Sequence, residues 1–358
     1  MNEAGRMRAR DLGVIIGGHP TGTHNAITDV PGVRVGQTTL QGDGINTGVT
    51  VVVPHDDIWT EPVFAGSHVL NGSGELTGLE WIRESGELTT AIGLTNTHSV
   101  GVVRDALVAE QVRVRGDGAY WSLPVVGETY DGFLNDINGF HVRPEHVRAA
   151  LESASDGPVA EGNTGGGTGM ICHQFKGGTG SASRVQGYTV GVLVQANHGR
   201  RERLRINGVP ITQPDVPLPA IPPGYAPGSG SIIVIVATDA PLLPHQCQRM
   251  AQRAALAVGR LGGTGEQYSG DLMLAFSTGN RGIPPYGAVE GAPEVAREIP
   301  LRMVGPQLMD LLFDLTIEAT EEAIVNAMVA AETVTGYRGY TVHAIDHDQL
   351  TSALRENS

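Results

Sequence analysis

Short apolar runs alternate with longer segments of helical pattern along this chain. Six runs bounded by Gly, Pro or polar residues predict β-strands, at positions 49–53, 91–95, 188–195, 232–237, 272–277 and 340–345. The run at 232–237 is almost wholly β-branched, which is typical of a strand buried on both faces. Helices are predicted to begin at Pro144 and to cover 244–261 and the Ala-rich stretch 306–333. Strands interleaved with helices indicate a layered α/β fold.

A Pro- and Gly-rich segment stops abruptly where the strand 232–237 is expected. Residues 214–230 read PDVPLPAIPPGYAPGSG, and prolines at this density exclude a regular helix or a central strand. Long segments without secondary structure inside a domain are usually functional sites or linkers. This one places the hydroxyl of Ser231 at the start of a buried strand. One interpretation is a Gly/Ser linker, and the other is a junction that cleaves itself.

The self-cleaving interpretation has a definite chemistry. Attack of the Ser231 hydroxyl on the carbonyl carbon of Gly230 turns the peptide into an ester, and water then releases Ser231 as a new N-terminus. Its α-amine, with a reference pKa of about 7.7 to 8.0, is substantially neutral near pH 7 and is able to act as the base for its own hydroxyl. Glycine on the acyl side has no Cβ to obstruct the attack.

Composition describes an ordinary globular protein without a polyanionic partner. Hydrophobic residues make up 40% of the chain and charged residues 17%. The formal net charge of -14 opposes binding to nucleic acid, which needs clustered Lys and Arg. The adjacent pair Arg200 and Arg201 is expected to face solvent. Neither a signal peptide nor an apolar stretch of ~18 residues is evident, so we expect a soluble, cytoplasmic protein without a membrane partner.

The cysteines, histidines and glycine runs predict neither a cofactor nor a metal ion. Cys172 and Cys247 allow a disulfide, but free buried thiols fit a reducing cytoplasm better. His343 and His347 have a helical metal-ligand spacing, yet no Glu lies between them and no third ligand is indicated, so we interpret their segment as exposed. Glycine runs within 165–180 lack the order of a phosphate-binding loop and are interpreted as turns that shape a substrate cleft.

Eight longer motifs, all in one order, carry a family resemblance. They are NAITDVPGVRVGQTT (25–39), TGVTVVVP (47–54), VFAGSHVLNGSGELTG (63–78), LTNTHSVG (94–101), PVVGETYDGFLNDING (124–139), GGGTGMICHQFKGGTGSASR (165–184), VLVQANHG (192–199) and GSIIVIVATDAPLLPHQ (230–246). They resemble the DmpA-type aminopeptidases, which are the L-aminopeptidase/D-esterase and β-aminopeptidase enzymes of the P1 peptidase family.

The resemblance implies a fold and a processing event. The fold is an αββα sandwich that resembles the N-terminal nucleophile hydrolases with different connectivity and is shared with ornithine acetyltransferases. The chain 1–358 is then a single domain, cleaved between Gly230 and Ser231 into an α chain, 1–230, and a β chain, 231–358. Relatives of this kind imply a homo-oligomer of αβ heterodimers.

Ser269 and Asp271 are candidates for activating the nucleophile. Residues two apart at the start of a strand point to the same face, so these two side chains are able to form a hydroxyl–carboxylate pair. By resemblance they match the serine and the acidic residue that orient and activate Ser231. The resemblance implies Glu at the acidic position of the β-peptide-cleaving members, and Asp is one methylene shorter. The alternative is a turn in which Asp271 bonds only to backbone.

Three further residues are assigned roles by the same resemblance. Asn197, at the end of a predicted strand, matches the asparagine that stabilises the oxyanion, and its alternative is a turn residue. Glu128 matches the carboxylate that binds the substrate ammonium. Tyr130 matches a tyrosine that binds the substrate or the oxyanion. Asp131 is a rival carboxylate to Glu128, and the alternative for this segment is a solvated turn.

These residues predict a self-processing serine aminopeptidase without a cofactor. It hydrolyses N-terminal residues from small peptides, amides or esters through an acyl-enzyme on Ser231. One alternative is an acyltransferase of the ornithine acetyltransferase type, which Ser231 disfavours because those enzymes carry Thr at the new N-terminus. The other is an unprocessed, non-catalytic binding protein. Whether an L-residue peptide, a D-alanyl ester or a β-peptide is preferred depends on the shape of the pocket and stays open.

Overall fold

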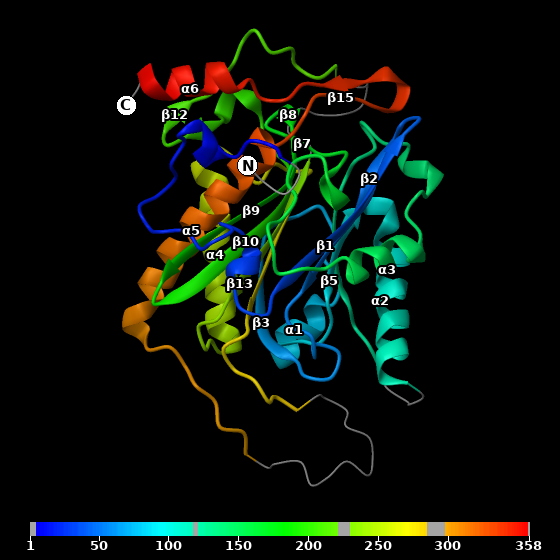
Figure 1. Cartoon of the computed structure of the whole chain (residues 1–358), viewed down its shortest axis with the longest axis vertical. Helices are drawn as coiled ribbons and strands as arrows, with labels where there is room; N and C mark the ends of the chain where they lie inside the picture. The colour runs from blue at the N-terminus through cyan, green and yellow to red at the C-terminus, as the bar shows by residue number, and fades with distance from the viewer. Residues whose placement is uncertain (1–4, 117–120, 221–229, 285–297, 357–358) are drawn as a thin grey trace.

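Two β-sheets lie face to face between two pairs of helices (Figure 1). The structure is a computed structural model that describes residues 5–116, 121–220, 230–284 and 298–356. The first sheet has the strand order β1 (Arg34–Gly42), β2 (Ile45–Val53), β5 (Ile92–Asn96) and β6 (Val125–Thr129). The second sheet has the order β4 (Glu87–Leu88), β3 (Val63–Gly72), β14 (Gly270–Ser277), β13 (Ser231–Thr238), β10 (Tyr188–Asn197) and β9 (Gly178–Gln186).

Helices cover the outer face of each sheet. On the four-stranded sheet lie α2 (Val100–Arg115) and α3 (Pro144–Glu152), and on the six-stranded sheet lie α4 (Pro244–Arg260) and α5 (Pro306–Val329). The short α1 (Leu79–Ser85) packs beside β3, and α6 (His347–Glu356) lies near the C-terminus. The predicted αββα sandwich is confirmed.

The central strand β13 explains why its sequence is so apolar. Side chains alternate between the two faces of a strand. Ile232 and Val234 pack in the core against α4 and α5, whereas Ile233 and Ile235 pack in the core between the two sheets. All eight residues of β13 are buried, as expected for a strand covered on both faces. By the same alternation, Ser231 faces the four-stranded sheet.

The three predicted helix starts are confirmed, each with proline in the first turn, where no intrahelical partner for its nitrogen is needed. The Ala-rich α5 packs closely on β9. A Cβ on Gly180 would lie 2.0 Å from the carbonyl oxygen of Ala323, so only glycine permits this approach of helix to strand. Five of the six predicted strands are also confirmed.

The exception is the predicted strand at 340–345. Only Thr341–Val342 is extended, as β16, paired with β15 (Val334–Thr335). The segment that follows differs from the expectation that it is exposed. Ile345 and Leu350 are buried, and the His347 imidazole lies 2.9 Å from the carbonyl oxygen of Val329. His347 begins α6 and His343 precedes it, so the two histidines do not share a helix face.

The structure also bears on the predictions for Arg201, the two cysteines, the loop at 214–230 and membrane-spanning helices. Arg201 is buried rather than solvent-facing, because its guanidinium lies 3.8 Å from the ring centroid of Phe175. Cys172 and Cys247 are free and buried. Residues 214–220 contain neither helix nor strand, and the rest of the predicted loop, 221–229, lies outside the described residues. Among the described residues, no helix has the length and apolar composition needed to cross a membrane.

Candidate active site

Strand register brings the candidate residues to one end of the six-stranded sheet. Ser231 pairs with Asn197 across the antiparallel β13–β10 ladder, and Ile232 pairs with Asp271 across the parallel β13–β14 ladder. Gly230 lies against β10, where a Cβ would be 1.9 Å from the carbonyl oxygen of Asn197. No side chain fits there. The glycine of the proposed scissile bond is therefore required by packing alone.

Ser231 is buried and its hydroxyl oxygen is held by the backbone. The N–H of Gly270 donates to Ser231 Oγ over 3.0 Å. Next to Gly270 along the chain, the Ser269 hydroxyl donates to Asp271 Oδ1 over 2.6 Å, which confirms the hydroxyl–carboxylate pair. The Asp271 carboxylate also accepts the backbone N–H of Ile232. The pairing and the backbone bond, considered as alternatives, therefore occur together.

Burial sets the charge of Asp271. Desolvation raises the pKa of this carboxyl to about 6, and the negative charge of Glu266 adds to the rise. Hydrogen bonds from Ser269 and the Ile232 N–H oppose it. Asp271 is therefore ionised above about pH 6, where its carboxylate accepts the hydrogen bond from the Ser269 hydroxyl.

The Asn197 side chain is clamped in one orientation. Its Oδ1 accepts the N–H of Ile171 over 2.7 Å, and its Nδ2 donates to the carbonyl oxygen of Tyr130 over 3.0 Å. An amide nitrogen carries two hydrogens, so one N–H is left for another acceptor. Nδ2 lies 3.5 Å from the point that a Cβ of Gly230 would occupy. The Asn197 amide nitrogen therefore lies close to Gly230, the residue on the acyl side of the proposed cleavage.

Glu128 is a buried carboxylate on β6 that makes two neutral hydrogen bonds. Oε1 accepts the N–H of Glu75 over 2.9 Å, and Oε2 accepts the hydroxyl of Thr97. Burial raises the pKa of Glu128, and these hydrogen bonds only partly oppose the rise. No Lys or Arg in the described parts of the chain forms an ion pair with it. A cation from a substrate would therefore find an unpaired carboxylate.

Glu128 and the nucleophile are linked through a close approach of two backbones. A Cβ on Gly74 would lie 3.1 Å from Glu128 Oε1 and 3.0 Å from the Cα of Gly270. Gly270 is the residue whose N–H holds Ser231 Oγ. The carboxylate and the hydroxyl therefore flank the same short stretch of backbone.

Asp131 belongs to a different cluster. It is fully buried, and its Oδ1 accepts from Asn135 Nδ2 over 3.1 Å. Desolvation raises its pKa to about 7. The interpretation of this segment as a solvated turn is wrong, since both carboxylates are buried. Between them, the half-buried Tyr130 uses its carbonyl to hold the oxyanion candidate Asn197.

Comparisons with known proteins assign the chain to a family. The model of peptidase family S58 matches residues 25–342. This chain belongs to peptidase family S58. A β-peptidyl aminopeptidase of Sphingosinicella microcystinivorans is 48% identical, over 98% of this chain and 92% of that protein. The solved β-aminopeptidase of a Burkholderia species superposes with a TM-score of 0.91 at 53% identity, over 98% of this chain and 99% of that one.

A second solved structure extends the family assignment to the fold. The L-aminopeptidase D-Ala-esterase/amidase of Ochrobactrum anthropi, described as a prototype of the serine aminopeptidases and a variant of the Ntn hydrolase fold, superposes with a TM-score of 0.87 at 43% identity and covers 98% of each chain. This S58 peptidase is accordingly a hydrolase of the aminopeptidase class, which decides against the acyltransferase alternative.

Sequence reasoning missed three groups of this candidate site. They are the N–H of Gly270, the N–H of Glu75 and the hydroxyl of Thr97. Thr97 lies inside the motif LTNTHSVG, so the motif itself was the available signal. The two backbone donors have no residue-type signal, because every residue other than proline carries an N–H.

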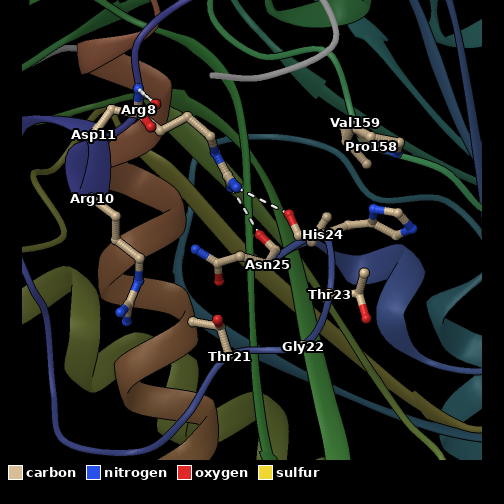
Figure 2. Close-up of a pocket in the computed structure, with 11 residues that line it drawn as sticks. Arg8, Arg10, Asp11, Thr21, Gly22, Thr23, His24, Asn25, Pro158 and Val159 are labelled. Atoms are coloured by element: carbon tan, nitrogen blue, oxygen red, sulfur yellow. Dashed lines mark hydrogen bonds between the residues drawn. The ribbon is translucent and has the colours of Figure 1, made fainter.

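A cavity of about 250 Å³ lies away from this site, beside the N-terminal segment of the S58 peptidase (Figure 2). Arg8 and Arg10 line it, and Figure 2 shows Arg8 directed at the backbone carbonyl of Asn25. Arg8 also pairs with Glu161 at 2.6 Å and Arg10 with Glu322 at 2.8 Å. Because buried carboxylates already neutralise both cations, the lining offers no argument for an anionic ligand.

Of the two glycine runs, only the first forms a turn, because the second enters strand β9 at Gly178. Residues Gly165–Gly167 make one turn of 3₁₀ helix that packs on β2, between the sheets. Their part in shaping a substrate cleft stays a prediction.

Proposed function

We propose that this aminopeptidase processes itself at Gly230–Ser231 and uses Ser231 as the nucleophile for its substrates. The observation that carries the proposal is the position of Ser231 Oγ, held by the Gly270 N–H beside the Ser269–Asp271 pair and the clamped Asn197 amide. A nucleophile, an orienting pair and an oxyanion donor are the groups that acyl transfer requires.

Self-processing forms and breaks bonds at the Gly230 carbonyl. Ser231 Oγ bonds to the Gly230 carbonyl carbon, the C–N bond breaks, and the proton of the hydroxyl moves to the released Ser231 amine. Water then hydrolyses the ester, which leaves a carboxylate on Gly230 and a free amine on Ser231. The free N–H of Asn197 stabilises the oxyanion in each step.

Peptide hydrolysis repeats this chemistry on a substrate. The Ser231 amine accepts the hydroxyl proton while Oγ attacks the substrate carbonyl. The proton passes to the leaving amine, and water hydrolyses the acyl-enzyme. Asp271 holds Ser269 beside the nucleophile, and Glu128 binds the ammonium of the substrate, which restricts attack to the first residue.

We further propose that the substrates are small peptides or amides with an N-terminal β-amino acid. The support is that relatives 48% and 53% identical over nearly the whole chain are named β-peptidyl aminopeptidase and β-aminopeptidase. The shorter acidic residue at 271 does not oppose this proposal, because its carboxylate still reaches Ser269 Oγ over 2.6 Å. Assembly into a homo-oligomer of αβ heterodimers and a cytoplasmic location stay predictions.

Intact-mass spectrometry and a substrate panel test both proposals. We expect two masses, for 1–230 and 231–358, and faster release of p-nitroaniline from β-homoalanyl than from L-alanyl or D-alanyl p-nitroanilide. A single full-length mass in active enzyme contradicts self-processing. Faster turnover of the L-alanyl or D-alanyl compound with two masses present contradicts only the choice of substrate.

A further inference from the structure

A thiol and two imidazoles lie close together next to Asn197. Cys172 ends the short strand β7 (Ile171–Cys172), His173 follows it, and His198 follows the last residue of β10. One ligand atom from each of the three lies within 4.8 Å of the others. Their exposed fractions are 0%, 0% and 2%. Thiolate and imidazole in one cluster are the ligands that Zn²⁺ prefers in proteins.

The imidazole of His173 is prepared to act as a ligand. Its Nδ1 lies 3.1 Å from the carbonyl oxygen of Arg200. A carbonyl only accepts, so Nδ1 carries the proton and Nε2 carries a lone pair. That Nε2 is buried and has no hydrogen-bond partner among the described residues. Metal-binding histidines characteristically donate their other ring N–H to a backbone carbonyl or carboxylate in this way.

The distance between Cys172 and His198 leaves room for an ion. Cys172 Sγ and His198 Nδ1 are 3.9 Å apart. With Zn–S of ~2.3 Å and Zn–N of ~2.1 Å, that separation corresponds to an S–Zn–N angle of ~125°, which is about 15° wider than the tetrahedral angle. His198 Nε2 is also buried without a hydrogen-bond partner in the described parts of the chain. Each of the two imidazoles therefore has one ring nitrogen without a hydrogen-bond partner there.

The backbone holds His173 in a conformation that its residue type does not favour. His173 and Gln174 have φ angles of 48° and 61° and form the two-residue turn between β7 and β8 (Phe175–Lys176). Such a turn normally takes Asn-Gly, because both residues need positive φ. The His173 N–H donates to the carbonyl oxygen of His198 over 2.6 Å, which fixes the two histidines relative to each other.

We propose that Cys172, His173 and His198 bind one Zn²⁺ ion through Sγ, Nε2 and Nδ1, with water as the fourth ligand. On binding, the Cys172 S–H bond breaks, the thiolate bonds to the ion and one proton leaves to solvent. The proposal departs from the absence of a metal expected from the sequence.

The position of the site gives it a structural role. Ile171, which precedes Cys172, donates to Asn197 Oδ1, and His198 directly follows Asn197. The ion therefore joins the two backbone segments that clamp the Asn197 amide. It raises the stability of this corner and takes no part in the acyl transfer.

Cobalt is the probe for the test, because Co²⁺ bound to thiolate gives an intense ligand-to-metal charge-transfer band. Since the site is buried, the protein is produced without a histidine tag in cells supplied with CoCl₂ or ZnSO₄, so that loading occurs during folding. We expect one metal ion per chain in each preparation and the charge-transfer band in the cobalt form. Protein produced in metal-depleted medium should have a lower Tm than the zinc-loaded protein.

Matched variants separate this site from other metal binding. Cys172→Ser and His173→Asn should each lose the band and at least tenfold of the bound metal, and Asn suits the positive φ at position 173. Cys247→Ser changes the other free buried thiol and should keep both. The cluster of His55, Asp57 and Glu61 contains no thiol, so cobalt bound there gives no such band.

Two results overturn the proposal. One is wild-type protein with less than a tenth of an equivalent of metal under both growth conditions. The other is a charge-transfer band that persists in Cys172→Ser. In either case the three residues form only a buried thiol–imidazole contact that helps to pack β7 against β10.

Discussion

The two sheets contribute different chemistry to the same site. At the start of β13 and β14, the six-stranded sheet presents neutral groups around Ser231, and the carboxylate of Asp271 there is already bonded to Ser269. At the end of β6, the four-stranded sheet presents Glu128 and then Asp131, both buried and without an ion pair among the described residues. Neutral hydrogen-bond donors suffice to support attack on a carbonyl, whereas recognition of an ammonium needs a negatively charged carboxylate. Burial of such a carboxylate raises its pKa.

The proposed roles of the two sheets predict that bond-making and substrate recognition are separable. Substitutions on the six-stranded side should impair both processing and turnover. Substitutions on the four-stranded side should impair only the recognition of a free amine, because the Gly230–Ser231 junction has no ammonium to bind.

Removal of the nucleophile should have the largest effect. Ser231→Ala is expected to leave one full-length, inactive chain, since no hydroxyl remains to attack Gly230. Ser231→Thr keeps a hydroxyl and serves as the control, with cleavage expected. Gel electrophoresis and N-terminal sequencing provide the readout. Two chains in Ser231→Ala would show that another group cleaves the junction.

Loss of the oxyanion donor should be smaller but still large. Asn197→Ala is expected to lower kcat by about 10² to 10³ with little change in KM, as for one missing oxyanion donor. Steady-state kinetics on processed enzyme measure this, and thermal unfolding shows whether the Ile171 contact was also needed for folding. A rise in KM alone would place Asn197 in substrate binding.

Neutralising Glu128 should separate the two sides most clearly. Glu128→Gln keeps the volume but removes the charge, so kcat/KM for free-amine substrates should fall by about 10²-fold or more, because the substrate ammonium is left without its partner. Self-cleavage should continue, and N-acetylated substrates should be inert in wild type. Asp131→Asn is the matched comparison, with a smaller loss. The reverse ranking of the two variants would assign the ammonium to Asp131.

The pH profile should show Asp271 on the six-stranded side. Its pKa is raised to about 6, so protonation below that pH removes the acceptor of the Ser269 hydroxyl. The Ser231 amine titrates at higher pH. The slope of log kcat/KM plotted against pH should therefore increase by about one below about pH 6. Asp271→Asn should lose that steepening, and a wild-type profile without it would contradict this role.

The smallest expected effect is a change in thermal stability at Asp131, on the four-stranded side. Asp131 has a folded-state pKa of about 7 against an ordinary value of 3.8, so folding favours its protonated form. That contribution is present below about pH 4 and is lost as the pH rises through 7. Asp131→Asn mimics the protonated form and should raise the Tm by a few degrees at pH 8 and by little at pH 4. The exposed Asp348→Asn is the control, and an equal gain at both pH values would refute the assignment.

The sequence by itself determined several of the elements and the hydroxyl–carboxylate pair. β-Branched runs specified strands such as 232–237, and prolines 144, 244 and 306 marked helix starts, because both signals act over a few residues. The Ser269–Asp271 pair followed from the two-residue period of a strand. Motif resemblance added Asn197 and Glu128, which no local pattern distinguishes from turn residues.

Tertiary structure alone decided which groups meet and which are buried. The Gly270 N–H reaches Ser231 only because β13 and β14 pair in parallel at one register, and the burial of Glu128 and Asp131 depends on the opposing sheet. The predicted strand at 340–345 shortened to two residues because it has only a two-residue partner. Such outcomes depend on contacts between distant segments, whose free energies exceed local propensity and are not written in any short stretch of sequence.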